Sequence, residues 1–211
     1  MGVMAQINDI KIRDRQITCR RLIAAVGSLL AREGFSGIGV NAVAREAGVD
    51  KKLIYRYFGG LAGLIGAFGR EGDFWPPALE LAGGDLRAFS VLPLDERLSV
   101  FSAQFIKALR RRPLTLKIMA WEMVASNELT RELELVREQG ILEFWHLFFA
   151  RETDAPHLQT GIMLAGAAIS YLMIRAGHID VYGGLALDSE QGWQEIEAGL
   201  GVMIRGLVRT G

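Results

Sequence analysis

The sequence lacks the residues that several common protein classes require. Its 211 residues include one cysteine, Cys19, so no disulfide can form within the chain. The three histidines are isolated, and none has a zinc-type spacing with cysteines or carboxylates. There is no Gly-x-Ser-x-Gly nucleophile motif and no phosphate-binding loop. We therefore expect no enzyme activity, no metal site and no cofactor.

Long apolar runs are also missing. The longest, residues 161–174, is shorter than the roughly 20 residues of a membrane-spanning helix, and His157 and Arg175 flank it. The N-terminus shows no apolar core of a signal peptide. We expect a buried core helix in this run, no membrane partner and a cytoplasmic location.

Neither sign of charge dominates, because 24 Lys and Arg balance 24 Asp and Glu. The distribution is uneven: residues 1–60 hold 10 basic against 5 acidic residues, and the remainder holds 14 against 19. A basic segment joined to an acidic one is typical of a polyanion-binding domain attached to a non-binding domain. Chance asymmetry in an ordinary soluble protein is the alternative.

The most informative stretch runs from residue 34 to residue 58. Apolar residues at 40, 43, 44 and 47 follow the spacing of one helix face, and Gly48 then ends the pattern. Asp50 is a good N-cap for a second helix over 51–57, which directs Ile54 inward. Two short helices joined at a glycine, with a basic and aromatic outer face, indicate a helix-turn-helix.

The same stretch resembles the DNA-binding domain of the tetracycline-repressor (TetR) family of bacterial regulators. The resemblance covers about residues 20–64. The matching residues are Gly34-Phe35, Val40, Val43-Ala44, Ala47-Gly48-Val49 and Leu53-Ile54-Tyr55-Arg56-Tyr57-Phe58.

The resemblance implies an all-α fold of about nine helices. An N-terminal three-helix domain, residues 1–60, would bind DNA, and a C-terminal helical domain, residues 61–211, would bind an effector and dimerise. A first helix over 13–33 would support the motif, with residues 1–12 frayed and Cys19 buried on its apolar face. Short breaks are expected between 74 and 94, and we find no clear strand signal.

DNA contact is expected from basic, polar and aromatic side chains around the motif. Lysine at the start of a recognition helix can reach guanine or phosphate, and the family commonly uses the tyrosine positions. A solvated helix face is the alternative, above all for the arginines of the motif. The candidates are Arg20, Arg21, Asn41, Arg45, Lys51, Lys52, Tyr55, Arg56 and Tyr57.

Two departures from the family pattern put particular DNA contacts in doubt. The family usually has Ser or Thr near Ile38 and Gly39, where a hydroxyl caps the first helix of the motif. It often has a phosphate-contacting Lys where this chain has Leu61.

Two helices near the C-terminus carry apolar seams that predict a helix bundle. The last helix, about 189–209, spaces Trp193, Ile196, Leu200, Met203 and Leu207 by three and four residues, with Ile204 and Val208 beside them. The preceding helix, which we expect to open at 153–156, is apolar nearly all round. Packing within one monomer is one solution, and a four-helix homodimer interface through about 157–209 is the other, which the resemblance favours.

An effector pocket is plausible in the second domain, because aromatic and flexible apolar side chains with a few polar tips line such cavities. The same residues could simply form core. The candidates for contact with a small apolar or aromatic effector are Trp121, Glu122, Phe144, Trp145, Phe148, Met163 and Tyr171.

The sequence therefore predicts a ligand-responsive transcriptional regulator, a repressor by family default, that binds a palindromic DNA operator as a homodimer. The alternative is a helical module of the same fold that binds a small molecule or protein and has little DNA affinity. Residues 37–42 also fit the dinucleotide fingerprint Gly-x-Gly-x-x-Ala, but that motif needs a preceding strand, which we do not expect here.

Overall fold

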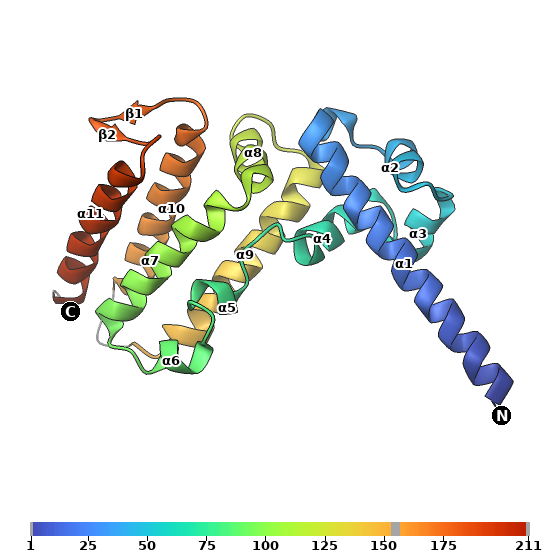
Figure 1. The fold of residues 1–211 in the computed structure, drawn as a ribbon, viewed down its shortest axis with the longest axis horizontal. Coiled ribbons are helices and arrows are strands. Elements are labelled where there is room, and N and C mark those ends of the chain that lie inside the picture. Colours follow the sequence, from blue (N-terminus) through green and yellow to red (C-terminus); the bar gives the residue numbers. More distant parts are fainter. Residues whose placement is uncertain (1, 153–156, 210–211) are drawn as a thin grey trace. The chain divides into compact units, whose positions relative to one another are not determined.

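The computed structural model describes residues 2–152 and 157–209, with side chains for 13–152 and 157–206. Eleven α-helices, one 3-10 helix and two short strands account for the regular structure of these residues (Figure 1). The predicted all-α class is confirmed. The helix count exceeds nine because the stretch 74–94 holds two short helices, α5 (Ala78–Leu81) and α6 (Leu86–Ser90).

Two compact units make up the chain. The first, which we call the head, combines Met1–Phe74 with Ser126–Arg137; the second, the body, combines Trp75–Ala125 with Glu138–Gly211. Helix α4 (Leu61–Glu71) groups with the head. The functional boundary expected at residue 60 stays a prediction.

Helix α1 is longer than the sequence pattern suggested. It spans Gly2–Glu33, so the predicted start of the helix at about residue 13 is wrong. No proline interrupts the segment, and nothing in its backbone requires an earlier break. The helix ends before Gly34, whose positive φ of 70° suits glycine and whose N–H donates to the carbonyl of Leu30 at 3.1 Å.

One face of α1 forms the core of the head. Leu22, Ile23, Val26 and Leu30 are buried there as predicted. Cys19, expected to be buried with them, is only half-buried because it lies at the edge of this face. The apolar face thus begins close to residue 22.

The helix-turn-helix is anchored on several sides within the head. Helix α1 packs against α2 (Val40–Ala47) and α4, and α3 (Lys52–Phe58) packs against α4. A Cβ atom at Gly63 would lie 2.0 Å from the carbonyl oxygen of Phe58, so the start of α4 closely approaches the end of α3. Such close approach leaves the two motif helices little freedom to shift.

The body is a helix bundle built on α7. This helix contacts α5, α8, α10 and α11, and α10 and α11 lie side by side (Figure 1). Its long helices are α7 (Leu94–Arg110), α8 (Pro113–Glu122), the second half of α9 (Glu128–Phe148), α10 (Leu158–Ala176) and α11 (Glu190–Arg209). The expected opening of α10 at residues 153–156 lies outside the described residues.

The predicted apolar seam of α11 is confirmed in the first half of the helix, and the prediction is wrong at one position in the second half. Trp193, Ile196 and Leu200 are buried, but Met203 is 66% exposed and Ile204 continues the buried face instead. An α-helix advances 3.6 residues per turn, so a seam that faces one neighbour drifts to the adjacent position. The side chains of residues 207 and 208 lie outside the described residues.

A small β-hairpin joins α10 and α11, where no strand was expected. β1 (Val181–Tyr182) pairs antiparallel with β2 (Leu185–Ala186), and both turn glycines, at 183 and 184, have positive φ. Two-residue strands are too short to show an alternating pattern. The Gly-Gly pair, which favours a tight hairpin turn, was the available signal.

A buried ion pair ties α5 to the end of α7. Arg112 donates through both terminal nitrogens to the Glu80 carboxylate, at 2.8 and 2.7 Å, and also to the carbonyl of Ala108 at 3.0 Å. Arg111 contacts the same carboxylate. The arginines, Arg112 first, lower the pKa of Glu80 against the opposing effect of its partial burial.

Helix α10 is strongly apolar but only partly buried. Its 19 residues reach the length and apolarity of a membrane span, and 28% of the 18-residue window that meets these criteria is buried. The apolar run 161–174 is therefore part of a longer apolar helix than the sequence analysis allowed. Core helices of soluble proteins meet the same criteria but are mostly buried, whereas in α10 the seam from Leu158 through Ile162 and Ile169 to Met173 is buried and the other sides are largely not, so the expected buried core helix is only partly buried.

Candidate nucleic-acid interface

Helix α2 turns one face to the head core and the other to solvent. Val43, Ala44 and Ala47 are buried, as the spacing predicted, whereas Asn41 and Arg45 are exposed. The apolar and polar positions alternate with the helical period, so burial of the first set directs the second outward.

The start of α2 has no side-chain cap. Gly39 occupies the N-cap position in an extended conformation, and no side chain there accepts a hydrogen bond from the first turn. This agrees with the missing hydroxyl noted in the sequence. The first helix of the motif is therefore held by packing, without the capping bond that Ser or Thr provides.

Replacing Gly39 by serine is expected to stabilise the head. A Cβ at this position meets no atom within 4 Å, and the φ of −166° is open to any residue. The hydroxyl can accept from the first-turn N–H groups, a gain of roughly 0.3–1 kcal/mol over glycine. Thermal unfolding should show a midpoint about 1–4 °C higher. Gly59→Ser, at a φ of 75°, is the unfavourable control, and a Gly39→Ser midpoint at or below wild type would contradict the capping argument.

The turn between the helices is built on Gly48. This residue has a left-handed conformation, φ 62° and ψ 42°, and the N–H of Val49 donates to the carbonyl of Ala44 at 3.0 Å. Asp50 accepts from the N–H of Lys52, the first residue of α3, at 2.8 Å, as the predicted cap would, although Lys51 stands directly before the helix and makes no side-chain cap bond. The turn therefore fixes the angle between α2 and α3 through backbone bonds.

Helix α3 displays the predicted contact residues on its outer face. Ile54 is completely buried and holds the helix to the core. Lys51, Lys52 and Arg56 are exposed, and the Tyr55 side chain is 57% exposed. The exposed Tyr55 ring and the exposed cations beside it present surface to a partner, although Arg56 also contacts the ring of Tyr57.

Tyr57 and Arg21 are engaged within the head itself. The half-buried Tyr57 ring contacts two guanidinium groups, with the Cζ of Arg15 at 5.4 Å and that of Arg56 at 5.8 Å from its centroid. Arg21 donates to the Gly48 carbonyl at 3.4 Å. Sequence reasoning missed Arg15, which reaches Tyr57 from 42 positions earlier in the chain.

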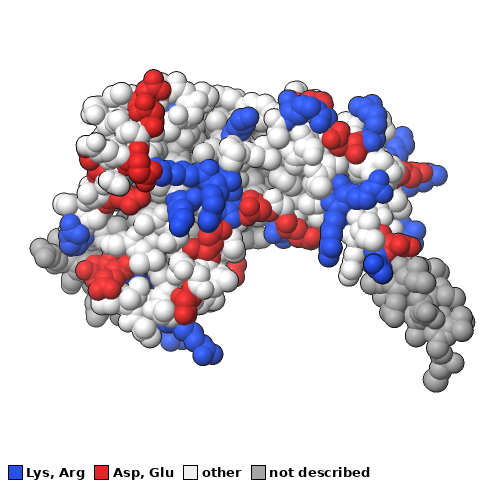
Figure 2. All heavy atoms as spheres, viewed as in Figure 1, with Lys and Arg blue, Asp and Glu red and all other residues white. Residues whose placement is uncertain are grey.

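Exposed charges on the head are only partly paired. Arg32 bonds to Glu33 and Glu46, and its hydrogen bond is the main cause of the lowered pKa of Glu46. Within residues 13–152 and 157–206, no ion pair involves Lys51 or Lys52. On the visible face of the head, basic groups are interspersed with acidic ones (Figure 2).

The remaining DNA-contact candidates also lie on this unit. Arg20 is exposed on α1. All nine predicted residues lie on α1, α2, the turn or α3, and all of them except Tyr57 are exposed. Their contacts with DNA stay a prediction. Leu61, where the family often has lysine, is half-buried as the first residue of α4.

The predicted effector residues are distributed over several surfaces of the body. Phe144 is buried and Phe148 half-buried in a cluster of rings, with 5.0 Å between their centroids. The half-buried Trp145 stacks on Phe149, whereas Glu122 is half-buried and Trp121 partly exposed at the end of α8. The other two, Met163 and Tyr171, are exposed on α10.

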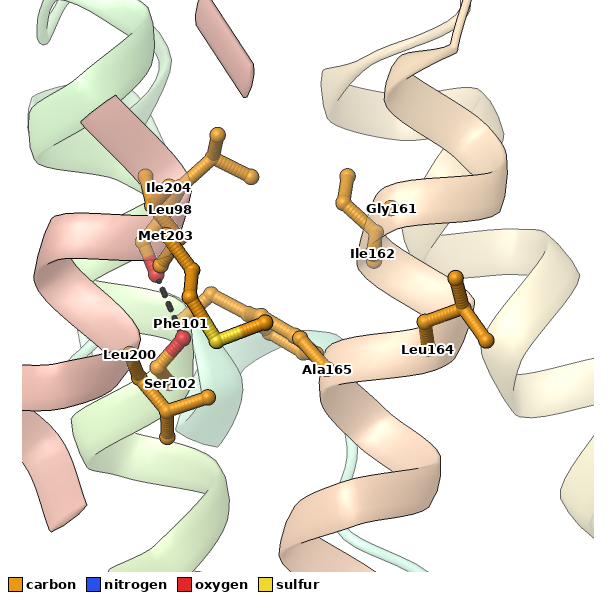
Figure 3. A pocket seen from close by; sticks show the side chains of 10 residues that line it. All are labelled: Leu98, Phe101, Ser102, Gly161, Ile162, Leu164, Ala165, Leu200, Met203 and Ile204. Carbon is orange, nitrogen blue, oxygen red and sulfur yellow. Dashed lines mark hydrogen bonds between the residues drawn. The ribbon is translucent and has the colours of Figure 1, made fainter. Parts of the chain in front are cut away.

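A cavity of about 110 Å³ lies elsewhere in the body, between α7, α10 and α11 (Figure 3). None of the seven predicted effector residues lines it. Their role in effector binding therefore stays a prediction, independent of this cavity.

The described part of the chain contains no cluster of metal-ligating side chains. Among residues 2–152 and 157–209, no group of three or more His, Cys, Asp and Glu could hold a metal ion. The ring of His146 bonds through Nδ1 to the carbonyl of Leu142 at 2.7 Å. The segment 37–42 follows a 3-10 helix (Phe35–Gly37), so the strand that a dinucleotide site requires is replaced by helix.

Comparison with known proteins agrees with this geometry. Residues 22–68 match the family described as bacterial regulatory proteins, tetR family, which confirms the resemblance and the N-terminal helix-turn-helix. No curated protein matches the chain.

Two solved structures share the fold. The fatty acid degradation regulator FadR from Bacillus halodurans is 15% identical, with a TM-score of 0.56 over 88% of this chain and 96% of that one. A linker-substituted mutant of HlyIIR is 13% identical, with a TM-score of 0.52 over 80% and 91% of the two chains. At such identities the likeness concerns the fold alone.

Proposed function

We propose that this chain, whose residues 22–68 carry the DNA-binding motif of the TetR family, is a ligand-responsive transcriptional regulator, a repressor, of the cytoplasm. It would bind a palindromic operator as a homodimer and perform no catalysis. One observation carries the proposal: the turn at Gly48 holds α3 with Ile54 buried while Lys51, Lys52 and Tyr55 remain exposed.

The exposed residues divide by the contacts they would make. Lys52 and Tyr55 on α3 would enter the major groove and contact base edges, with Lys51 and Asn41 beside them. Arg20, Arg45 and Arg56 would contact phosphates, which position the protein without reading sequence. Arg21 and Tyr57 would contact the sugar-phosphate backbone of the DNA. Within the head, Arg21 is already positioned by its hydrogen bond to Gly48 and Tyr57 by its contact with Arg56.

The homodimer would use the uncovered sides of α10 and α11. The apolar residues Met163, Leu164 and Tyr171 on α10 and Val202 and Met203 on α11 are 38–66% exposed. Large contiguous apolar surfaces are rare on monomers and typical of interfaces. A second copy would cover them in a four-helix arrangement, which also accounts for an apolar helix that is only partly buried.

Placing a charge on this face should separate the dimer. Met163→Glu combined with Val202→Glu would bury four carboxylates in the assembled interface, a penalty of several kcal/mol. Sedimentation should show a folded monomer at concentrations where the wild type is a dimer. Leu142→Glu with Leu147→Glu, on α9, is the matched control, since both leucines are exposed outside this face. A dimer that survives the first pair of changes would place the interface elsewhere.

An effector would act by shifting the balance between two dimer forms. A small apolar or aromatic molecule in the body, contacting some of the aromatic and methionine residues predicted above, would favour the form whose heads no longer fit the operator. It can do so only through its different affinity for the two forms.

Selection of DNA fragments from random sequence tests the proposal. We expect a palindrome to be enriched, with half-sites about 34–36 Å apart as two recognition helices of a dimer require. Binding to that fragment should weaken steeply with salt, by on the order of 1,000-fold between 50 and 200 mM for about six phosphate contacts. Enrichment of no sequence over background would contradict the proposal.

One observation favours a second candidate, a module of the same fold with little DNA affinity. Gly39 supplies no capping hydroxyl and Leu61 no cation, so two of the family's usual DNA-proximal groups are missing. The same selection distinguishes the candidates, because this module would enrich no palindrome.

A further inference from the structure

The cavity between α7, α10 and α11 is open on one side. Its floor is formed by Leu98, Phe101 and Ser102 of α7, which are 2%, 9% and 4% exposed. Ile162 points into the gap from α10, and Met203 reaches across it from α11 toward Ala165 (Figure 3). The volume of about 110 Å³ is smaller than the roughly 150 Å³ of an enclosed apolar cavity that binds benzene, but this cavity is open on one side.

The lining offers no free hydrogen-bonding group. Its one polar side chain is Ser102, whose hydroxyl donates to the carbonyl of Leu98 at 2.9 Å within α7 (Figure 3). A water in this space would find too few partners, because an ordered buried water needs two to four. A ligand with a charge or an unmatched polar group would likewise lose its hydration without compensation. The lining thus selects an uncharged hydrocarbon group.

The space exists because α10 carries small residues where it passes α7. Gly161 and Ala165 lie one turn apart and both line the cavity. Residues four apart lie on the same face of a helix. Small residues at both positions therefore leave unfilled space at one place on that face. Ile162 and Ile169, on the same helix, are buried in the body. The missing side-chain volume is therefore confined to the positions of Gly161 and Ala165.

The open side of the cavity belongs to the face proposed for dimerisation. Two lining residues, Leu164 and Met203, are 65% and 66% exposed, and both are members of that face. A second copy seated there would close the mouth of the cavity. Met203, flexible at the rim, could adjust to the occupant.

We propose that this cavity binds a small uncharged hydrocarbon group, about the size of one benzene ring, and that the second copy closes it. Occupancy then favours the dimer, because the ligand is fully removed from water only when both copies are present. The inference rests on the homodimer proposed above. It concerns a site separate from the seven predicted effector residues.

Fluorobenzene is a suitable probe, and no DNA is needed. Fluorine NMR should show it binding to the wild-type protein. Sedimentation equilibrium at about ten times its dissociation constant should show the dimer dissociation constant lowered on the order of 100-fold, since two ligands bind the dimer and the open monomer binds little. The DNA selection can fail without affecting either measurement.

Ala165→Leu fills the cavity and should abolish both fluorobenzene binding and its effect on dimerisation, while circular dichroism reports a folded protein. Ala165→Val is a smaller change that serves if the leucine disturbs the bundle. Ala31→Leu, at an exposed position of α1, is the control and should behave as wild type.

Four results would overturn the proposal. Fluorobenzene could fail to bind the wild type, or could bind equally well to Ala165→Leu. It could bind without changing the dimer dissociation constant. Finally, Ala165→Leu could weaken the dimer while fluorobenzene has no effect on the wild type, which would identify a side chain of the second copy as the occupant.

Discussion

Replacing Lys52 and Tyr55 together by alanine is expected to lower the affinity for the selected operator by on the order of 100- to 1,000-fold. Each side chain is exposed on the outer face of α3, and a specific contact to a base is worth about 1–3 kcal/mol. Neither residue supports the fold: Lys52 uses only its backbone N–H in the cap with Asp50, and Ile54 anchors the helix.

A mobility-shift titration on the enriched fragment measures this effect. Circular dichroism and sedimentation should show that the double variant is folded and assembled like the wild type. Lys107→Ala with Lys117→Ala removes two exposed cations from the body and should leave affinity within about threefold. Wild-type affinity in the α3 double variant would count decisively against α3 as the recognition helix.

Replacing Glu80 by glutamine should destabilise the body by about 1.5–3 kcal/mol. The change removes the carboxylate from the charge-assisted hydrogen bonds with the Arg112 guanidinium, which is 6% exposed, and a hydrogen bond to a charged group contributes roughly 1.5–3 kcal/mol. Glu190→Gln is the matched control, because Glu190 accepts from Arg110 at 2.8 Å but is 70% exposed, and such pairs contribute below about 1 kcal/mol. Urea unfolding of the two variants measures the difference, and equal losses would contradict the argument.

The pH dependence of this difference follows from the lowered pKa of Glu80. A carboxyl whose folded pKa lies below its ordinary value of 4.5 contributes stability that is fully present above that value. The contribution is lost as pH falls through the folded pKa, since the folded protein then also binds the proton. The stability gap between wild type and Glu80→Gln should therefore be constant near neutrality and shrink below pH 4.5.

The local features of the head could be read from the sequence because they are set by neighbours in the chain. The period from Val40 to Ala47, the glycine at 48 and the cap at Asp50 each act within a few residues, and the structure has all of them. The length of α1 was missed because the segment before residue 13 carries no strong period, although nothing in it ends a helix.

Features that join distant residues could not be read in this way. Arg15 reaches Tyr57, and Glu80 pairs with Arg112, across separations that no helical or strand period connects. The cavity depends on what α7 places opposite Gly161 and Ala165, and α7 lies far from these residues in the sequence. Sequence patterns assign faces to helices, but they do not say how completely two faces fill the space between them.

The single cysteine of the sequence provides a specific site for a spectroscopic label. Cys19 is half-exposed on α1 in the head, and no other cysteine competes for a label. A nitroxide attached there would give one label per chain, and a twofold assembly would then yield one distance between labels by pulsed electron resonance. That distance, recorded with and without a candidate effector, would measure how far apart the two heads of the proposed dimer lie. The measurement requires no change to the coding sequence.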